Sequence, residues 1–164
     1  VKPEHQYIEA PVRVFHDQES VKAACRAQEI TQDTVVVVRF QGPKANGMPE
    51  LHSLTPLLKN IQAKGINVAL VTDGRMSGAS GSVPAAIHVS PEALDGGAIA
   101  KLRDGDVVRV DANNGTLEIV TEGVLDRPNA EADMSVSAFG LGRELFTGFR
   151  RDVGSADTGA CALF

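Results

Sequence analysis

The sequence has no tryptophan, one tyrosine and only two cysteines among its 164 residues. Cys25 and Cys161 lie far apart in the chain, so they form no Cys-x-x-Cys metal motif, and two cysteines are too few for a disulfide framework. No apolar run approaches the ~18 residues that cross a bilayer, and no signal peptide opens the chain. We therefore expect a protein of the reducing cytoplasm that has no membrane partner.

Positive charge is also scarce. The chain carries 16 basic and 21 acidic residues, for a net charge of -5, and its lysines and arginines are scattered along the sequence. A nucleic-acid surface needs clustered positive charge, so no nucleic-acid partner is expected. The length suits one compact domain, and no repeat or low-complexity segment suggests another. We therefore expect a single domain over residues 1–164.

The first half of the chain contains a strand, helix, strand pattern. Val35–Val38 is typical of a strand buried on both faces, and Val68–Val71 predicts the next one. Between them, apolar residues from Leu51 to Ile61 recur at helical spacing, and Gly65 is placed to end that helix. Such units join their strands in parallel, and ligands bind beyond the carboxyl ends. The loops FQGPKANGMPEL and TDGRMSGASGS, which follow the two strands, should therefore converge.

The second half is richer in short strands. Asn114 and Gly115, between two alternating apolar runs, predict a β-hairpin. Further helices are predicted over about Gln18–Gln28, where Asp17 can act as the cap, and over about Leu141–Arg151. We therefore expect a mixed, β-rich α/β fold with few helices, and not a doubly wound one.

The glycine-rich segments match no common nucleotide-binding or nucleophile signature. The first loop has Met48 where a P-loop requires lysine, GLGREL lacks the third glycine of a dinucleotide fingerprint, and RMSGA lacks the glycines of a nucleophile elbow. The second loop instead offers Arg75, three serines and several backbone N–H groups, which suit a small anionic ligand. The alternative is that its glycines only permit a tight turn and its serines are solvated.

The sequence resembles the C-terminal domain of the dihydroxy-acid dehydratase / 6-phosphogluconate dehydratase family over nearly its whole length. The segments that carry this resemblance are VVRFQGPKANGMPELHSLTP, VTDGRMSGASGSVPAAIHVSPEA and GGAIAKLRDGDVVRVDANNG. FQGPKANGMPELH, GRMSGASG and the ending TGACALF are more similar to the members that act on 6-phosphogluconate than to those of branched-chain amino-acid synthesis. The resemblance implies a swivelling β/β/α domain, with a barrel-like sheet core and flanking helices, at the C-terminal end of a longer dehydratase.

The resemblance also implies a reaction. Family members of this kind convert 6-phospho-D-gluconate to 2-keto-3-deoxy-6-phosphogluconate and water, a hydro-lyase step of the Entner-Doudoroff pathway. They carry a 4Fe-4S cluster, held on three cysteines of a larger N-terminal domain, that acts as a Lewis acid on the leaving hydroxyl. We expect the full-length protein to be a homodimer, and this chain alone to be inactive. Two rivals stay open, namely dehydration of a dihydroxy acid or another aldonic acid, and a non-catalytic domain that binds a small acid.

Particular residues match the motifs of the family. Ser77 matches the serine proposed as the base that removes the C2 proton, and its alkoxide would need nearby cations and N–H groups. Glu50 matches a position that contributes a carboxylate to Mg²⁺, with other ligands from the N-terminal domain. Arg75, Gly78 and Ser80 are expected to contact the sugar-acid phosphate substrate. The alternative for Glu50 is an exposed acid in the first turn of the next helix, where the helix dipole favours it.

Other polar residues carry weaker expectations. Asp73 is suited to orient its loop by bonding to local amides. His88 is expected to be a structural histidine within a strand, and His16 and His52 to be surface residues. Gln41, with the KANGM segment beside it, favours phosphogluconate over a dihydroxy acid as the substrate.

Overall fold

One six-stranded mixed sheet organises the fold of the computed structural model, which describes residues 1–77 and 81–163. The strands are β1 (Tyr7–Phe15), β2 (Thr34–Val38), β3 (Val68–Thr72), β4 (Ala85–Ala86), β5 (Val107–Asp111) and β6 (Thr116–Ile119). They lie in the order β4-β3-β2-β1-β5-β6, with parallel pairing from β4 to β1 and antiparallel pairing from β1 to β6. The sheet is therefore parallel in one half and antiparallel in the other.

Five α-helices and several 3-10 helices accompany the sheet in the described residues. The α-helices are α1 (Gln18–Arg26), α2 (Pro43–Asn46), α3 (Leu54–Gln62), α4 (Ser135–Ala138) and α5 (Thr147–Asp152). The 3-10 helices are Pro3–His5, Ala93–Asp95, Ala98–Lys101, Val124–Asp126, Arg143–Phe146 and Ala156–Thr158. None of these helices is long and apolar enough to cross a membrane.

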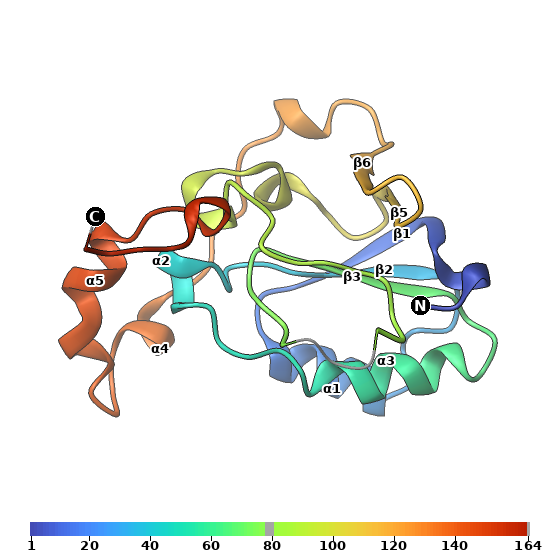
Figure 1. Ribbon diagram of the computed structural model, residues 1–164, viewed down its shortest axis with the longest axis horizontal. Coiled ribbons are helices and arrows are strands. Elements are labelled where there is room, and N and C mark those ends of the chain that lie inside the picture. The colour runs from blue at the N-terminus through green and yellow to red at the C-terminus, as the bar shows by residue number, and fades with distance from the viewer. Residues whose placement is uncertain (78–80, 164) are drawn as a thin grey trace.

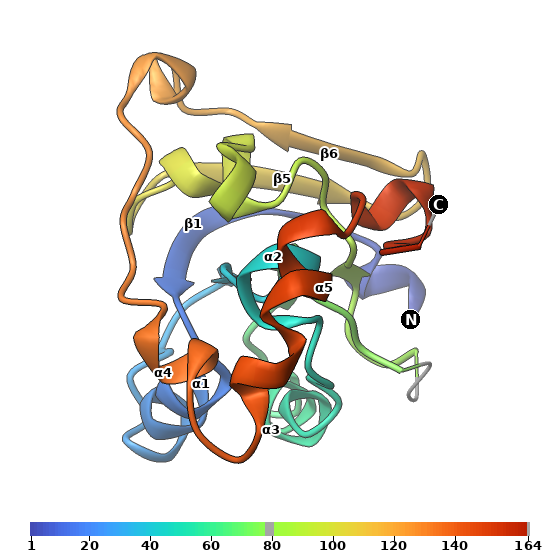
Figure 2. The same cartoon turned by 90° about the vertical axis from the view of Figure 1, so that its left-hand side faces the viewer.

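The central strand β2 is buried on both faces because its valines alternate between two cores. Val36 and Val38 pack with apolar side chains of α1 and α3. Val35 and Val37 face the opposite way and pack with residues of β1, β5 and the 3-10 helices. Figures 1 and 2 show α1 and α3 together on one side of β1, β2 and β3, while the sheet curls so that β5 and β6 lie on the other side. The mixed, β-rich fold class predicted from the sequence is confirmed.

The predicted strand, helix, strand unit is also confirmed, with one correction. β2 and β3 pair in parallel, and Gly65 has a φ of +85° shortly after α3 ends. However, α3 begins at Leu54, so Leu51 and Glu50 precede it. Leu51 is fully buried from within the preceding loop. The alternative interpretation of Glu50 as a residue of the first helical turn is therefore wrong.

The C-terminal half follows the prediction in its hairpin but not in its last helix. Asn114 and Gly115 lie in the turn between β5 and β6, where Oδ1 of Asp111 accepts hydrogen bonds from two main-chain N–H groups of the turn. The helix predicted from Leu141 is interrupted, because Leu141 has a φ of +54° and α5 begins only at Thr147. The large apolar side chains of this region remain exposed.

Candidate active-site loops

Two loops meet beyond the carboxyl ends of β2 and β3. The first loop comprises residues 39–53 and the second comprises residues 73–77 and 81–84 of the described chain. Glu50 and Arg75 form an isolated parallel bridge, in which the N–H of Leu51 donates to the carbonyl of Arg75 over 3.2 Å. The Arg75 side chain reinforces this pairing, since its Nε donates to the carbonyl of Met48 at 2.8 Å. The convergence predicted from the parallel strands is confirmed.

Glu50 is the centre of this meeting point. Its Oε1 accepts hydrogen bonds from the main-chain N–H groups of Ser77 and His52, both at 2.8 Å, and its Oε2 lies 3.1 Å from Nη1 of Arg75. The N–H of Ser77 is the largest influence that holds the pKa of Glu50 below its ordinary value, and His52 and Arg75 act in the same direction. The carboxylate therefore remains ionised at neutral pH.

The structure brings Glu50, Arg75 and Ser77 onto one exposed surface. For a site in which a metal and a substrate bridge the two loops, the sequence predicts that the Glu50 carboxylate and the Ser77 hydroxyl lie within roughly 8 to 10 Å of each other on one side of the domain. The structure agrees with this prediction, because Glu50 contacts both the main chain and the side chain of Ser77. The other two residues expected to contact the substrate, Gly78 and Ser80, lie outside the described residues.

Asp73 is a buried carboxylate that ties three segments together. Its Oδ1 accepts from the N–H of Gln41 at 2.9 Å, and its Oδ2 accepts from Phe40 at 3.1 Å and Ala93 at 2.9 Å. Burial raises the pKa of Asp73 above its ordinary value, although the three N–H groups favour its charged form. The prediction that Asp73 bonds to local amides is wrong in its partners, because the three amides lie 20 to 33 residues away in sequence and two of them belong to the first loop.

Glu92 fixes the start of α2 in the same way. Its two carboxylate oxygens accept from the N–H groups of Lys44 at 2.9 Å and Ala45 at 2.8 Å, which have no partner within the helix. Gly42 allows this approach, because a Cβ at that position would lie 2.5 Å from Oε2 of Glu92. The sequence offered no pattern that links residue 92 to the first loop. Only the tertiary structure identifies Glu92 as a support of the site.

Arg39, at the end of β2, was not predicted to have a role. Its Nη1 donates to the carbonyls of Ile99, Ala100 and Leu102, and its Nε lies 3.1 Å from Nε2 of His16. Burial lowers the pKa of His16, so its neutral ring can accept this bond. His16 is exposed in part, as predicted, but it is also a structural partner of Arg39. The sequence feature that could have indicated this structural role is the position of Arg39, a charged residue directly after four buried valines.

Gln41 is a structural residue of the first loop. Its side-chain nitrogen donates to the carbonyl of His16 at 2.7 Å, and its side-chain oxygen accepts from Asn46 at 3.2 Å. Because the residue is buried, this amide is occupied in holding the loop. The side-chain amide of Gln41 is therefore not free to contact a substrate. The prediction that Gln41 favours phosphogluconate has no direct contact behind it in this structure.

The remaining histidine and cysteine expectations have mixed outcomes. His88 lies outside β4, is exposed and has a φ of +58°, so its placement in a strand was wrong. His52 is exposed, as predicted. Cys25 and Cys161 are both free and partly buried. Among the residues that the structure describes, no group of three or more His, Cys, Asp or Glu side chains is arranged to hold a metal ion.

Two pockets border the first loop, but neither is lined by Arg75 or Ser77. One of about 570 Å³ lies against Phe40, Gln41 and Met134, and another of about 380 Å³ lies against α2 and α5. Glu50, Arg75 and Ser77 thus belong to an open surface of this chain. An open surface with an ionised carboxylate, a guanidinium and a hydroxyl suits one half of a site that a second body completes.

Comparison with known proteins assigns the chain to a family. Residues 1–160 match the family described as dihydroxy-acid/6-phosphogluconate dehydratase C-terminal, and the chain belongs to this family. It is similar to the phosphogluconate dehydratase of Pseudomonas aeruginosa, with 59% identity over 99% of this chain and 27% of that protein. The phosphogluconate dehydratase of Escherichia coli K12 is 50% identical over the same shares. The chain thus spans about 27% of the length of these relatives.

A relative from the other branch of the family is less similar. The dihydroxy-acid dehydratase of Sulfurisphaera tokodaii is 44% identical over 70% of this chain and 20% of that protein. Both the identity and the matched share of this chain are lower than for the two phosphogluconate dehydratases. The chain is therefore more similar to these two phosphogluconate dehydratases than to this dihydroxy-acid dehydratase.

Proposed function

We propose that this chain is the C-terminal catalytic portion of an enzyme that dehydrates 6-phospho-D-gluconate to 2-keto-3-deoxy-6-phosphogluconate. The observation that carries the proposal is the joint placement of Glu50, Arg75 and Ser77 on one surface of a chain whose similar relatives are named phosphogluconate dehydratases. This reaction breaks the C2–H and C3–O bonds and forms water and an enol, which tautomerises to the 2-keto acid. The step belongs to the Entner-Doudoroff route of sugar-acid breakdown.

Ser77 is the proposed base at C2. A serine hydroxyl is a very weak acid, so it needs neighbouring positive charge to form an alkoxide. In this chain its immediate neighbour is the ionised Glu50, which by itself disfavours a second negative charge. The base role therefore requires that the charge of Glu50 be balanced by a cation. Arg75, 3.1 Å from Glu50, supplies part of that balance.

Mg²⁺ is the proposed second cation, with Glu50 as one ligand and the others from the rest of the polypeptide. A carboxylate has about four acceptor sites, and the structure fills them with the N–H groups of Ser77 and His52, with Arg75 and with the Ser77 side chain. Glu50 would therefore act as a single ligand once one of these contacts, such as that of the Ser77 side chain, gives way to the metal. When bound, Mg²⁺ would hold oxygen atoms of the sugar acid and lower the pKa of groups beside it.

The iron-sulfur cluster expected from the resemblance does not fit this chain. A 4Fe-4S cluster requires several cysteine thiolates, whereas the sequence has only Cys25 and Cys161. Burial also raises the pKa of Cys25, which keeps it a thiol. We propose that the cluster is bound by the N-terminal domain, and that the full-length protein is a cytoplasmic homodimer.

Arg75, Gly78 and Ser80 are the proposed substrate contacts. A guanidinium binds carboxylate and phosphate oxygens through paired N–H groups. Arg75 already spends its Nε on Met48 and one Nη on Glu50, which leaves its remaining N–H groups for the substrate.

The test is an assay of the full-length enzyme on 6-phosphogluconate and on a branched dihydroxy acid, each as the only substrate. We expect turnover of 6-phosphogluconate to exceed that of the dihydroxy acid by at least about a hundredfold, because a site built for a polar group rejects analogues that lack it. The opposite preference would assign the chain to the dihydroxy-acid branch. Binding of both acids without turnover would indicate a non-catalytic domain.

A further inference from the structure

The C-terminal region exposes a group of large apolar side chains, among which the rings of Phe146 and Phe149 lie 6.3 Å apart. α4, the 3-10 helix Arg143–Phe146 and α5 contain no buried residue. We call the following six side chains, each more than half exposed, the apolar surface: Val136, Phe139, Leu141, Leu145, Phe146 and Phe149. Soluble monomers rarely expose contiguous apolar patches of this kind unless they bind something.

These helices cannot be stable through their own contacts. α4 has four residues and α5 has six, which is far below the length at which an isolated helix forms in water. Figure 1 shows both helices beside α2 at one end of the sheet, and α4 also borders the start of α1 across a pocket lined by Gln18, Glu19, Val136 and Ser137. α2 packs against both helices, and the exposed apolar side chains of this region need a further covering body.

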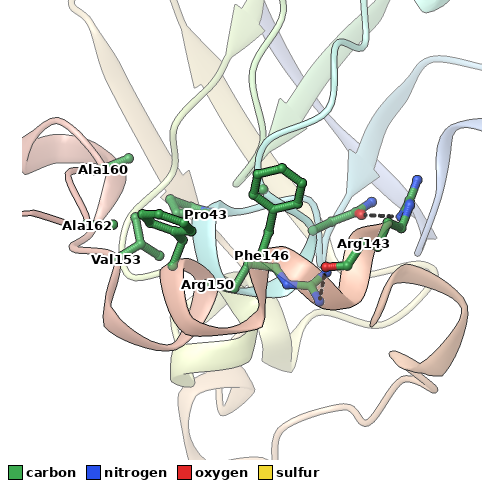
Figure 3. A pocket seen from close by; sticks show the side chains of 10 residues that line it. Pro43, Arg143, Phe146, Arg150, Val153, Ala160 and Ala162 are labelled. Carbon is green, nitrogen blue, oxygen red and sulfur yellow. Dashed lines mark hydrogen bonds between the residues drawn. The ribbon is translucent and has the colours of Figure 1, made fainter. Parts of the chain in front are cut away.

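A pocket beside the apolar surface is shaped to receive a side chain. It has a volume of about 380 Å³ and lies between α2 and α5 (Figure 3), where it is lined by Pro43, Phe146, Phe149, Val153, Arg143 and Arg150. The apolar walls suit an aliphatic or aromatic residue of a partner. The two guanidinium groups at the pocket suit a negatively charged neighbour of that residue.

The charges at this pocket are not balanced within the chain. Arg143 donates to the side-chain oxygen of Asn46 at 3.3 Å, and Arg150 donates to the carbonyls of Ser137 and Ala138. Neither guanidinium has an ion pair with a carboxylate among residues 1–77 and 81–163. The adjacent Arg151, by contrast, pairs with Asp152 at 2.7 Å. A partner that covers this surface should therefore present a carboxylate.

We propose that the apolar surface docks against the remaining part of the same dehydratase polypeptide, through a face that is apolar and carries a carboxylate opposite Arg143 and Arg150. Most of the length of the relatives lies outside this chain, which spans only 27% of them. A covalently joined partner acts at a high effective concentration, which favours it over a second copy. This inference rests on the proposed function only in taking the chain as part of a longer dehydratase.

The docking surface is continuous with the active-site loops. The Ser137 hydroxyl donates to the carbonyl of Ala45 at 3.4 Å, and Arg143 contacts Asn46, so both contacts fall on α2. α2 lies in the first loop, which also contains Glu50 and its bond to Ser77. A body that presses on α4 and α5 would therefore also set the position of the first loop.

Hydrogen-deuterium exchange on the full-length wild-type enzyme tests the docking directly. Amides of residues 135–152 should exchange on the order of a hundredfold more slowly than those of the hairpin turn 112–115, because only docked helices of this length resist opening. Equal rates in the two segments would overturn the proposal. Slow exchange that is lost on dilution would also overturn it, because it would show that a second copy covers the surface.

Two matched pairs of variants locate the contact. Phe149→Ser should speed exchange of residues 135–152 at least tenfold in the full-length enzyme, whereas Leu125→Ser, at a similarly exposed apolar residue on another segment, should not. Arg150→Gln should also speed exchange of residues 135–152 at least tenfold. Arg151→Gln, which loses only the ion pair with Asp152, should leave this exchange unchanged. Indistinguishable effects within both pairs would contradict docking at this surface.

These measurements separate the docking from the proposed reaction. An enzyme with no activity on 6-phosphogluconate but with slow exchange at residues 135–152 would overturn the proposed function and support the docking. An enzyme that is active on 6-phosphogluconate but exchanges rapidly at residues 135–152 would support the proposed function and overturn the docking.

Discussion

The main-chain N–H of Ser77 donates a 2.8 Å hydrogen bond to Oε1 of Glu50, although 27 residues separate the two in sequence. The bond joins the loops that follow two parallel strands, and Arg75 completes it from the other carboxylate oxygen. A proposed base and a proposed metal ligand are thus held in contact. Each depends on the charge state of the other, which makes their roles testable by single substitutions.

Ser77→Ala in the full-length enzyme should lower kcat by about a hundredfold or more, which is the usual loss for a proton-transfer group. The substitution removes one exposed hydroxyl and leaves the main-chain bond to Glu50 in place, so the fold should be unchanged. Steady-state kinetics and circular dichroism check the two expectations. Ser53→Ala, at an exposed serine of the first loop, is the control. Near-normal turnover in Ser77→Ala would mean that the base lies elsewhere.

Glu50→Gln should raise the Mg²⁺ concentration needed for half-maximal activity by at least about tenfold, because a neutral amide is a weaker ligand for a hard cation than a carboxylate. It should also lower kcat, since Arg75 loses its ion pair and the loop loses a fixed contact. Activity titrated against Mg²⁺ measures both effects. A variant with an unchanged Mg²⁺ requirement would remove Glu50 from the proposed metal site. Glu29→Gln, on the same chain but paired with Arg13, serves as the control.

Asp73→Asn should destabilise the chain by about 2 to 4 kcal/mol, because an amide cannot accept all three buried N–H bonds that the carboxylate accepts. Urea unfolding of the 164-residue chain measures this free energy. Asp126→Asn, at an exposed position, should change stability by less than about 0.5 kcal/mol. Similar effects for the two variants would show that the ties from Asp73 to the first loop are not important for the fold.

Glu92 and Asp106 should give stability differences with opposite pH dependence. Burial raises the folded-state pKa of Glu92 above about 4.5, so its contribution to stability is present at low pH and is lost as pH rises through that raised value. Burial also opposes ionisation of Asp106, but hydrogen bonds from Arg127 and the main chain of Arg103 hold its pKa below 3.8. The stability that Asp106 contributes is present above pH 3.8 and is lost as pH falls through its lowered folded-state pKa.

Urea unfolding of wild type, Glu92→Gln and Asp106→Asn across the acid range checks these signs. As pH rises, the free energy of unfolding of the wild type should fall relative to that of Glu92→Gln. Over the same pH range it should rise relative to that of Asp106→Asn. Parallel curves for the two variants would refute the assignment.

The isolated 164-residue chain should show no dehydratase activity and no iron-sulfur absorbance. The sequence has two cysteines, which are too few for a three-cysteine cluster site. Purification followed by iron analysis and an assay on 6-phosphogluconate tests this. A brown protein that retains iron would contradict the expectation.

Local pattern was sufficient for β2, β3, the β5–β6 hairpin and the convergence of the two loops, but not for β1 or for the bounds of β4. Runs of valine have few stable placements other than a doubly buried strand, and a short helical crossover brings the ends of parallel strands to one edge. That is why the sequence pattern alone places Arg75 and Ser77 near Glu50. The family motifs supplied the proposed roles of these residues, which the pattern did not contain.

Tertiary structure decided the supports of the site and the fate of the C-terminal helix. Glu92 lies 48 residues from Lys44, and no local rule predicts which backbone N–H groups a distant carboxylate will bind. The spacing of Leu141, Leu145 and Phe149 correctly suggested helical structure in this region, but it could not show where the helix begins or what it packs against. The periodicity of apolar residues specifies which face of a helix is apolar, but whether that face is buried depends on a partner surface. Within the described chain, the apolar side chains of this helical region remain exposed.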